Sequence, residues 1–123
     1  MRVIFFALLV AFSNATWAEW QFLGETEGET DADAASFFFD ATSIKKEGEI
    51  RRVWTVSNKN NASWRILLEY NCKKEQVRFL SNTKFSQPMA QGTVLAVDND
   101  IGSWAYVAPR TVHEVLLTLV CTK

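Results

Sequence analysis

The stretch S-W-R-I-L-L-E-Y-N-C, residues 63–72, alternates apolar and polar side chains along most of its length. One parity is apolar and ends in a cysteine, and it consists of Trp64, Ile66, Leu68, Tyr70 and Cys72. The other parity carries Ser63, Arg65, Glu69 and Asn71, and only Leu67 breaks its polar character. Because successive side chains of a strand point to opposite faces of a sheet, this pattern predicts a β-strand with one buried face. The face with Arg65 and Glu69 is expected to stay free.

The preceding segment predicts the hairpin partner of this strand. Residues 51–58, R-R-V-W-T-V-S-N, place Trp54 and Val56 on alternate positions, and the polar turn N-K-N-N-A joins the two segments. Such a turn between two alternating runs is typical of an antiparallel hairpin. Further strands are predicted at residues 19–23, 36–40, 75–80 (with an irregular continuation through Phe85) and 93–97, and residues 45–49, K-K-E-G-E, are predicted to be a charged turn.

A helix is predicted at the C-terminal end of the sequence. Thr111 fits the N-cap, and Glu114 three residues later completes a capping box, in which both side chains accept hydrogen bonds from backbone N–H groups that a helix leaves unpaired. A buried stripe at helical spacing consists of Val112, Val115, Leu116, Leu119 and Val120. An alternative strand would put Val115, Leu117, Leu119 and Cys121 on one parity, but the capping box favours the helix.

Cys121 lies off this predicted stripe, about 180° from Val112 in an ideal helix. We therefore expect the last helical turn to loosen so that the thiol reaches the sheet. Taken together, the segments predict an α+β fold, in which an antiparallel sheet of about six strands carries the C-terminal helix on one face.

The N-terminal residues predict export. Residues 1–18 combine one positive charge at Arg2, an apolar run from Val3 to Phe12 and a small, polar end, which is typical of a secretory signal peptide. Cleavage is predicted after Ala18, with Ala15 as the alternative, and the apolar run is too short for a membrane anchor. Residues 19–123 then form a single domain in the periplasm or outside the cell.

Cys72 and Cys121 are the only cysteines in the sequence. An exported protein with two cysteines usually pairs them, and a bridge closing so long a loop would stabilise the fold by about 4 kcal/mol in the chain-entropy model. The alternative is two free thiols acting as a redox pair, although the wide spacing is unlike a C-x-x-C motif. The bridge would fasten the helix to the sheet.

The charge distribution excludes some classes of partner. The net charge is −1, which gives no case for binding nucleic acids or anionic membranes, because these partners require a strongly basic face. Residues 24–35, G-E-T-E-G-E-T-D-A-D-A-A, alternate acidic and small residues. Carboxylates suit Ca²⁺, but the order of ligands in an EF-hand is missing, so a solvated loop is the favoured interpretation.

No grouping of residues in the sequence indicates catalysis. His113 is the only histidine, and its place in the first helical turn predicts a neutral, solvated side chain because the helix dipole disfavours its charged form. Motifs for a serine nucleophile, a phosphate-binding loop or a zinc site are missing. The sequence therefore predicts a protein that is not an enzyme and has no metal or cofactor.

Aromatic residues are plentiful and offer two interpretations. The set includes Trp20, Trp54, Trp64, Trp104, Phe37, Phe38, Phe39, Phe79 and Phe85. In a small domain most of them are expected to fill the core. A second sheet face that carries aromatics, with Phe38 as the best candidate, would instead form a platform for carbohydrate, for a partner protein or for a second copy in a homodimer.

Several landmarks follow one another in an order that matches a known family. Trp20 stands near the predicted mature start, F-F-F-D-A-T-S-I spans residues 37–44, R-V-W-T-V spans residues 52–56, and the strand ending at Cys72 follows. Arg78, Trp104 ahead of Pro109, and V-C at residues 120–121 complete the order. Over nearly the whole mature chain the sequence resembles the surface-adhesin protein E family of Gram-negative bacteria.

The resemblance implies a curved antiparallel sheet whose C-terminal helix is tethered by a disulfide, and binding of host extracellular-matrix and plasma proteins. Asp40, Ser43 and Ile44 match the family's turn, where the Asp and Ser side chains are expected to bond local backbone. Adhesins of this family look like lipidated outer-membrane proteins, whereas no cysteine stands at the predicted cleavage site here. A lipid anchor is therefore not expected.

The leading hypothesis is an exported, non-enzymatic protein that binds another protein through a sheet face or loops. The alternative is a periplasmic inhibitor or envelope-maintenance factor of the lysozyme-inhibitor type, in which the acidic residues 24–35 would enter the cleft of a basic enzyme. A small hydrolase is a third hypothesis, and a deep pocket with converging polar groups would support it.

Overall fold

The hairpin predicted around residues 51–72 forms the middle of the sheet. Strands β4 (Ile50–Lys59) and β5 (Ala62–Asn71) pair antiparallel without interruption, from Ile50 opposite Asn71 to Lys59 opposite Ala62. The two turn residues, Asn60 and Asn61, have φ angles of 57° and 62°. Two-residue hairpins whose twist matches the strands need positive φ at both positions, and asparagine tolerates that conformation. The asparagine-rich turn thus explains the hairpin, which confirms its prediction.

The computed structural model describes residues 18–26 and 34–122. The predicted signal peptide, apart from Ala18, and the central part of the acidic segment lie outside these residues. Besides β4 and β5, the elements are β1 (Trp20–Thr26), β2 (Ala35–Asp40), the 3-10 turn η1 (Ala41–Ser43), β3 (Lys45–Glu47), β6 (Gln76–Gln87), β7 (Gln91–Asp98), β8 (Ala105–Tyr106) and helix α2 (Val112–Cys121).

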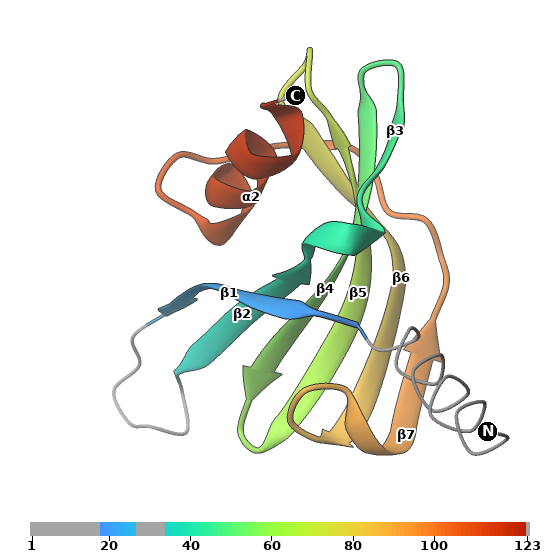
Figure 1. Ribbon diagram of the computed structural model, residues 1–123. Coiled ribbons are helices and arrows are strands. Elements are labelled where there is room, and N and C mark those ends of the chain that lie inside the picture. Colours follow the sequence, from blue (N-terminus) through green and yellow to red (C-terminus); the bar gives the residue numbers. More distant parts are fainter. Residues whose placement is uncertain (1–17, 27–33, 123) are drawn as a thin grey trace, which may run out of the picture.

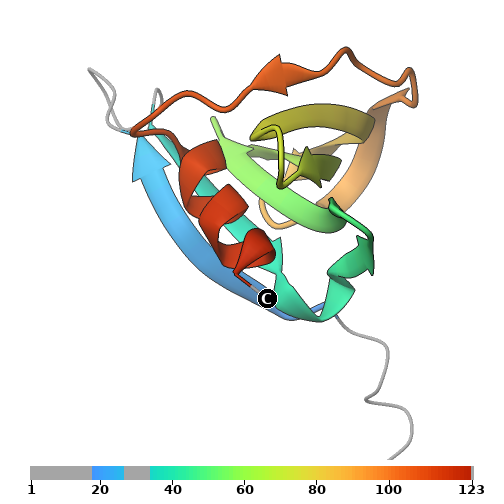
Figure 2. The same cartoon turned by 90° about the horizontal axis from the view of Figure 1, so that it is seen from above.

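The strands form one antiparallel sheet with the order β1-β2-β4-β5-β6-β7, to which β3 adds through β4 and β8 through β6. The sheet curves into a half-barrel (Figure 1). Seen from above, α2 lies inside the curve (Figure 2). This arrangement confirms the predicted α+β fold with a C-terminal helix on one face of an antiparallel sheet.

The irregular continuation predicted beyond residues 75–80 is confirmed, whereas the turn predicted at residues 45–49 needs correction. The predicted strand at residues 75–80 continues as β6 to Gln87, through a bulge where Leu67 and Leu68 of β5 face Ser81 and Phe79, so that Leu80 is the extra residue. A bulge increases local twist, which helps the sheet to curve. The predicted turn at residues 45–49 is mostly strand β3, because only Gly48, at φ 58°, and Glu49 form the turn.

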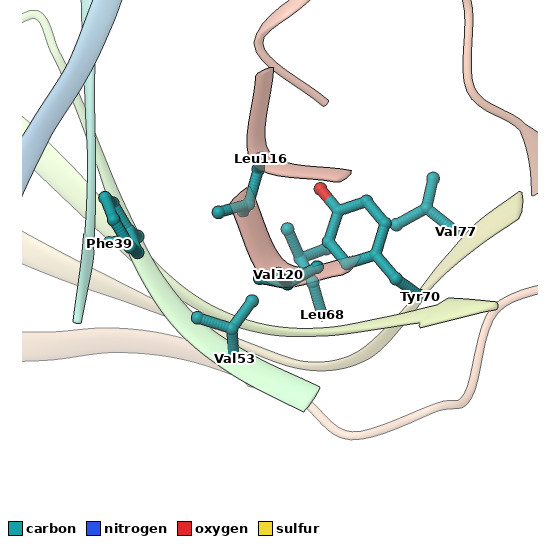
Figure 3. Close-up of a cluster of buried hydrophobic side chains, with 7 residues drawn as sticks. All are labelled: Phe39, Val53, Leu68, Tyr70, Val77, Leu116 and Val120. Atoms are coloured by element: carbon teal, nitrogen blue, oxygen red, sulfur yellow. The ribbon is translucent and has the colours of Figure 1, made fainter. Parts of the chain in front are cut away.

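A core lies between the sheet and α2. Figure 3 shows its buried side chains, which are Phe39, Val53, Leu68, Tyr70, Val77, Leu116 and Val120. The strand residues of this set point into the curve of the sheet, and Leu116 and Val120 meet them from the helix (Figure 3). Leu68 and Tyr70 belong to the parity predicted to be buried, so the alternation in residues 63–72 identified the helix-covered face correctly at this end of β5.

Helix α2 begins at the predicted cap. The Thr111 side chain accepts a hydrogen bond from the Glu114 backbone N–H, at 3.3 Å. The Glu114 carboxylate accepts from the backbone N–H of Arg110, at 3.0 Å, rather than from that of Thr111. The capping box is therefore half formed, and its second bond is displaced by one residue.

The buried stripe of α2 differs from the predicted one. Leu116 and Val120 are buried, whereas Val115 and Leu119 are 47% and 48% exposed. Leu117 and Cys121 pack against the core in their place. The helix is thus rotated by about one position relative to the prediction, and Val115 and Leu119 are wrong as core residues.

The disulfide joins Cys72, the first residue after β5, to Cys121, the last residue of α2, with Cα atoms 5.7 Å apart. Since α2 stays helical to its last residue, the predicted loosening of the final turn is wrong. The rotation of the helix removes the need for it, because Cys121 already lies on the packed side. In the part of the chain that the structure describes, no helix is long and apolar enough to cross a membrane.

Candidate functional site

The sheet face away from α2 was the predicted place for a binding surface, and Glu69 occupies its middle. Glu69 is only 2% exposed, so the expectation that it stays free is wrong. In the sheet register it lies between Arg52 of β4 and Arg78 of β6. Both donate to it, Arg52 Nε to Oε2 at 2.8 Å and Arg78 Nη2 to Oε1 at 2.6 Å. Arg78 also lies over the Trp104 ring, 4.5 Å from its centroid.

Burial and hydrogen bonding act on this carboxylate in opposite directions. Burial alone raises the pKa of Glu69, but the hydrogen bonds and positive charges of Arg52 and Arg78 outweigh it, so the pKa is lowered. The carboxylate is therefore ionised at neutral pH, and its oxygens are occupied by the two arginines. This cluster ties three strands together and leaves little bonding capacity for a ligand.

Arg65, the second residue of the predicted free face, lines a cavity. Its guanidinium carbon lies 5.6 Å from the Trp54 ring centroid and 5.0 Å from that of Phe85. The cavity has a volume of about 480 Å³, and its other walls include Trp20, Asp40 and Gln91. Ala18, which the predicted signal cleavage would remove, lines its edge. We call this cavity the Arg65 pocket.

A second cavity lies on the helix side, where α2 begins. It has a volume of about 490 Å³, within the range of ligand pockets in proteins. Apolar walls come from β1, β2, β5, β6 and α2, as Leu23, Phe37, Ile66, Leu68, Phe79 and Leu116. Ser57, Thr111 and His113 add polar groups. We call this cavity the helix-side pocket.

His113 is half-buried and lies beside Tyr70. The Tyr70 hydroxyl and His113 Nδ1 are 3.1 Å apart. Burial raises the pKa of Tyr70, so the hydroxyl keeps its proton, and burial lowers the pKa of His113, so the imidazole is neutral near pH 7. The predicted neutral state is confirmed, but its cause is burial, and the predicted solvated position is wrong.

The helix-side pocket offers hydrogen-bonding groups beside apolar walls. A neutral histidine beside a protonated tyrosine provides a hydrogen-bond pair, and the pocket's one carboxylate, Glu25, lies on an exposed residue. In residues 18–26 and 34–122, no group of three His, Cys, Asp or Glu side chains could hold a metal ion. These groups supply shape and polarity for a ligand, without an assembled nucleophile and base.

Strand β7 is the longest strand that is exposed at every residue, and its sequence carries no functional motif. All eight residues of β7 are exposed, including the apolar Val94, Leu95 and Val97 at 51%, 55% and 59%. It lies at the end of the strand order, and among the described residues no strand pairs with its outer edge. Figure 1 shows it at the rim of the half-barrel. An apolar strand with unpaired backbone groups can pair with another chain.

Other residues singled out from the sequence are spread over the fold. Phe38 packs edge-on against Phe22, with ring centroids 5.5 Å apart, whereas its neighbour Phe39 is in the core. The Lys84 Nζ lies over the Trp64 ring, 5.2 Å from the ring centroid. Within the acidic segment, residues 27–33 lie outside the described residues. Phe38, Phe39 and Trp64 therefore lie in three separate places, whereas Trp20 and Trp54 both line the Arg65 pocket.

The turn after β2 has the predicted bonding. Asp40 Oδ1 accepts from the backbone N–H of Thr42 at 2.9 Å and from its hydroxyl at 2.5 Å. The Ser43 hydroxyl donates to the Asp40 carbonyl at 2.6 Å and accepts from the Trp54 backbone N–H at 3.0 Å. These contacts fix the crossover from β2 toward β3 and β4.

Comparison with known proteins identifies the family. The family model described as surface-adhesin protein E matches residues 20–122. A crystal structure of Haemophilus influenzae protein E has a similar fold, with a TM-score of 0.61 at 16% sequence identity, and the match covers 70% of this chain and 80% of that chain. No curated protein matches the sequence. The family match spans nearly all of the described fold, and the chain therefore belongs to the surface-adhesin protein E family.

Proposed function

We propose that this protein is an exported, non-enzymatic adhesin that binds extracellular-matrix or plasma proteins of a host through strand β7. Membership of the surface-adhesin protein E family supports an adhesin-like role. The observation that carries the proposal is the edge of β7, which is exposed and apolar and pairs with no strand in residues 18–26 and 34–122. An extended segment of the partner protein would add a strand to this edge, so that backbone hydrogen bonds supply affinity and side-chain contacts supply selectivity.

The sequence of β7, Q-G-T-V-L-A-V-D, supports this use of the edge. Soluble proteins usually protect an exposed edge strand with lysine or proline or by making it very short. Strand β7 has neither residue along its eight positions. Two register shifts in its pairing with β6 twist the strand, but Val94, Leu95 and Val97 remain exposed.

The test is a binding assay against a panel of immobilised matrix and plasma proteins, with two matched double variants. Leu95→Lys with Val97→Lys adds charge to the β7 edge, and we expect at least about a tenfold loss of affinity for any ligand that the wild type binds. Val115→Lys with Leu119→Lys adds the same charge to the exposed side of α2 and should leave binding unchanged.

Equal binding by both variants, or a blank panel for the wild type, would overturn the proposal. The other candidate occupant of the edge is a second copy of the chain. Size-exclusion chromatography with light scattering detects such a dimer, because the β7 variant alone would then have a lower mass than the wild type. Inhibition of lysozyme by the wild type would instead favour the inhibitor alternative.

Export is part of the proposal and has its own test. It is supported by the signal-like residues 1–18 and by the disulfide, which persists in oxidising compartments. Mass spectrometry of protein from the periplasm and the culture medium should give a chain that begins at Glu19, without a lipid. A cytoplasmic chain that retains residues 1–18 would contradict it.

A further inference from the structure

Arg65 carries a positive charge that no ion pair among the described residues balances. Its Nε is shielded from solvent and donates to no acceptor among the residues that the structure describes. The ion pairs described above go to Glu69 from Arg52 and Arg78, and none joins Arg65 to a carboxylate in the described part of the chain. A buried donor without an acceptor is unfavourable, and such exceptions are often found at functional sites.

Two aromatic rings hold this guanidinium in place. Trp54 of β4 and Phe85 of β6 lie on either side of β5, with ring centroids 5.6 and 5.0 Å from the guanidinium carbon. Stacking on aromatic faces orients the planar guanidinium and partly replaces its water. Arg65 is thus preorganised, as a site for a planar anion requires.

The turn between β6 and β7 forms one wall of the Arg65 pocket. Its residues Met89 and Ala90 have φ angles of 60° and 58°, a left-handed conformation that is costly for residues other than glycine. The Met89 backbone N–H donates to Asn58 Oδ1, and that of Ala90 donates to Ser63 Oγ, both at 2.9 Å. Ser63 is fully buried, so these bonds hold the strained turn against the sheet.

The remaining walls are suited to a ring that carries hydroxyl groups. The hydrogen bonds to Asp40 from Thr42 go to Oδ1 and leave Oδ2 without a partner among the described residues, and the Gln91 amide adds a donor and an acceptor. Trp20 has no ring or cation contact in the described residues, so its face is available for stacking.

We propose that the Arg65 pocket binds an acidic sugar, a pyranose ring that carries a carboxylate. Arg65 pairs with the carboxylate, Asp40 and Gln91 bond ring hydroxyls, and Trp20 packs on the apolar face of the ring. The cavity volume of about 480 Å³ falls within the range of small-ligand pockets. Although Gln91 is the first residue of β7, this pocket is inferred without reference to protein binding at that strand.

Isothermal titration calorimetry of the purified protein tests the proposal with glucuronate and N-acetylneuraminate as probes and with glucose as the neutral control. We expect at least one acidic sugar to bind at least about tenfold more tightly than glucose. Arg65→Gln should raise its Kd at least about tenfold. Lys84→Gln is the matched control, since it also removes a cation over a tryptophan but on the opposite face of the sheet, and it should leave the Kd unchanged.

Trp20→Ala is the second variant, placed where β1 begins, so the test stands if Arg65→Gln does not fold. It should weaken acidic-sugar binding at least about threefold, because it removes the stacking surface. The proposal is overturned if both acidic sugars bind no better than glucose, if the Arg65 and Lys84 variants lose affinity equally, or if acetate competes as well as the sugars do.

Discussion

Glu69 accepts hydrogen bonds from two arginines while it is almost fully buried, so we expect it to contribute strongly to stability. Glu69→Gln should lower the free energy of unfolding by about 1 to 3 kcal/mol, because it leaves Arg52 and Arg78 without their acceptor charge. Urea unfolding at pH 7 measures this change. The control, Glu75→Gln, alters an exposed turn position and should stay within about 0.5 kcal/mol of the wild type. Equal effects would show that the cluster adds no stability.

The same carboxylate predicts a pH dependence. Its pKa in the folded protein is lowered from the ordinary value of 4.5, so its contribution is complete above that value and is lost as the pH falls through the lowered pKa. The difference in stability between the wild type and Glu69→Gln should therefore shrink on acidification below about pH 4.5. A constant difference down to pH 2 would contradict the ion pairs.

His113 should act in a different pH window. Burial lowers its pKa below the ordinary value of 6.5, so the unfolded chain takes up a proton before the folded one does. Stability should fall as the pH drops from 7 through the range just below 6.5, and His113→Gln should remove this part of the slope. Urea midpoints measured between pH 5 and 7.5 test this, and identical slopes would mean that the histidine titrates as it does in water.

The alternation in residues 63–72 identified the sheet face on which each side chain lies, but not how deeply each one is buried. It put Arg65 and Glu69 on the face away from the helix, where both lie. It could not show that Arg52 and Arg78 flank Glu69, because that depends on the register of three strands. Nor could it show that Trp54 and Phe85 would enclose Arg65, since these rings come from different strands.

At the level of elements, α2 gives a sharp test of the helix rotation. Leu116→Ala should cost about 2 to 5 kcal/mol, because Leu116 is 1% exposed in the core. Leu119→Ala changes the same residue type on the same helix, but at a 48% exposed position, and should cost less than about 1 kcal/mol. Thermal or urea unfolding of both variants measures the difference. A larger loss for Leu119→Ala would restore the stripe that the sequence alone predicts.

The elements show where local sequence was sufficient. The asparagine turn and the Thr111 cap are set by neighbouring residues, and both were predictable. The helical stripe was misplaced because Val115 and Leu119 fit an apolar pattern as well as Leu117 and Cys121 do, and only the sheet decides between them. Strand β7 was predicted as a strand, but its place at the edge follows from the topology of the whole sheet.

At the scale of the whole molecule, the disulfide fastens the last residue of α2 to the end of the central hairpin. It closes a loop with a sequence separation of 49 residues. In the chain-entropy model, the double variant Cys72→Ser with Cys121→Ser should be less stable by about 4 kcal/mol, which corresponds to roughly 15 to 20 °C in Tm for a domain of this size. Calorimetry with and without reductant measures the change. An unchanged Tm would show that the helix packs on the sheet without the bridge.

Hydrogen–deuterium exchange tests the proposed binding of partners at the β7 edge most directly. The wild-type protein is compared alone and in complex with the tightest ligand of the matrix and plasma panel. If a partner strand pairs with β7, the amides of residues 91–98 should exchange more slowly in the complex, whereas those of α2 should not change. Slower exchange elsewhere, with residues 91–98 unaffected, would contradict the account.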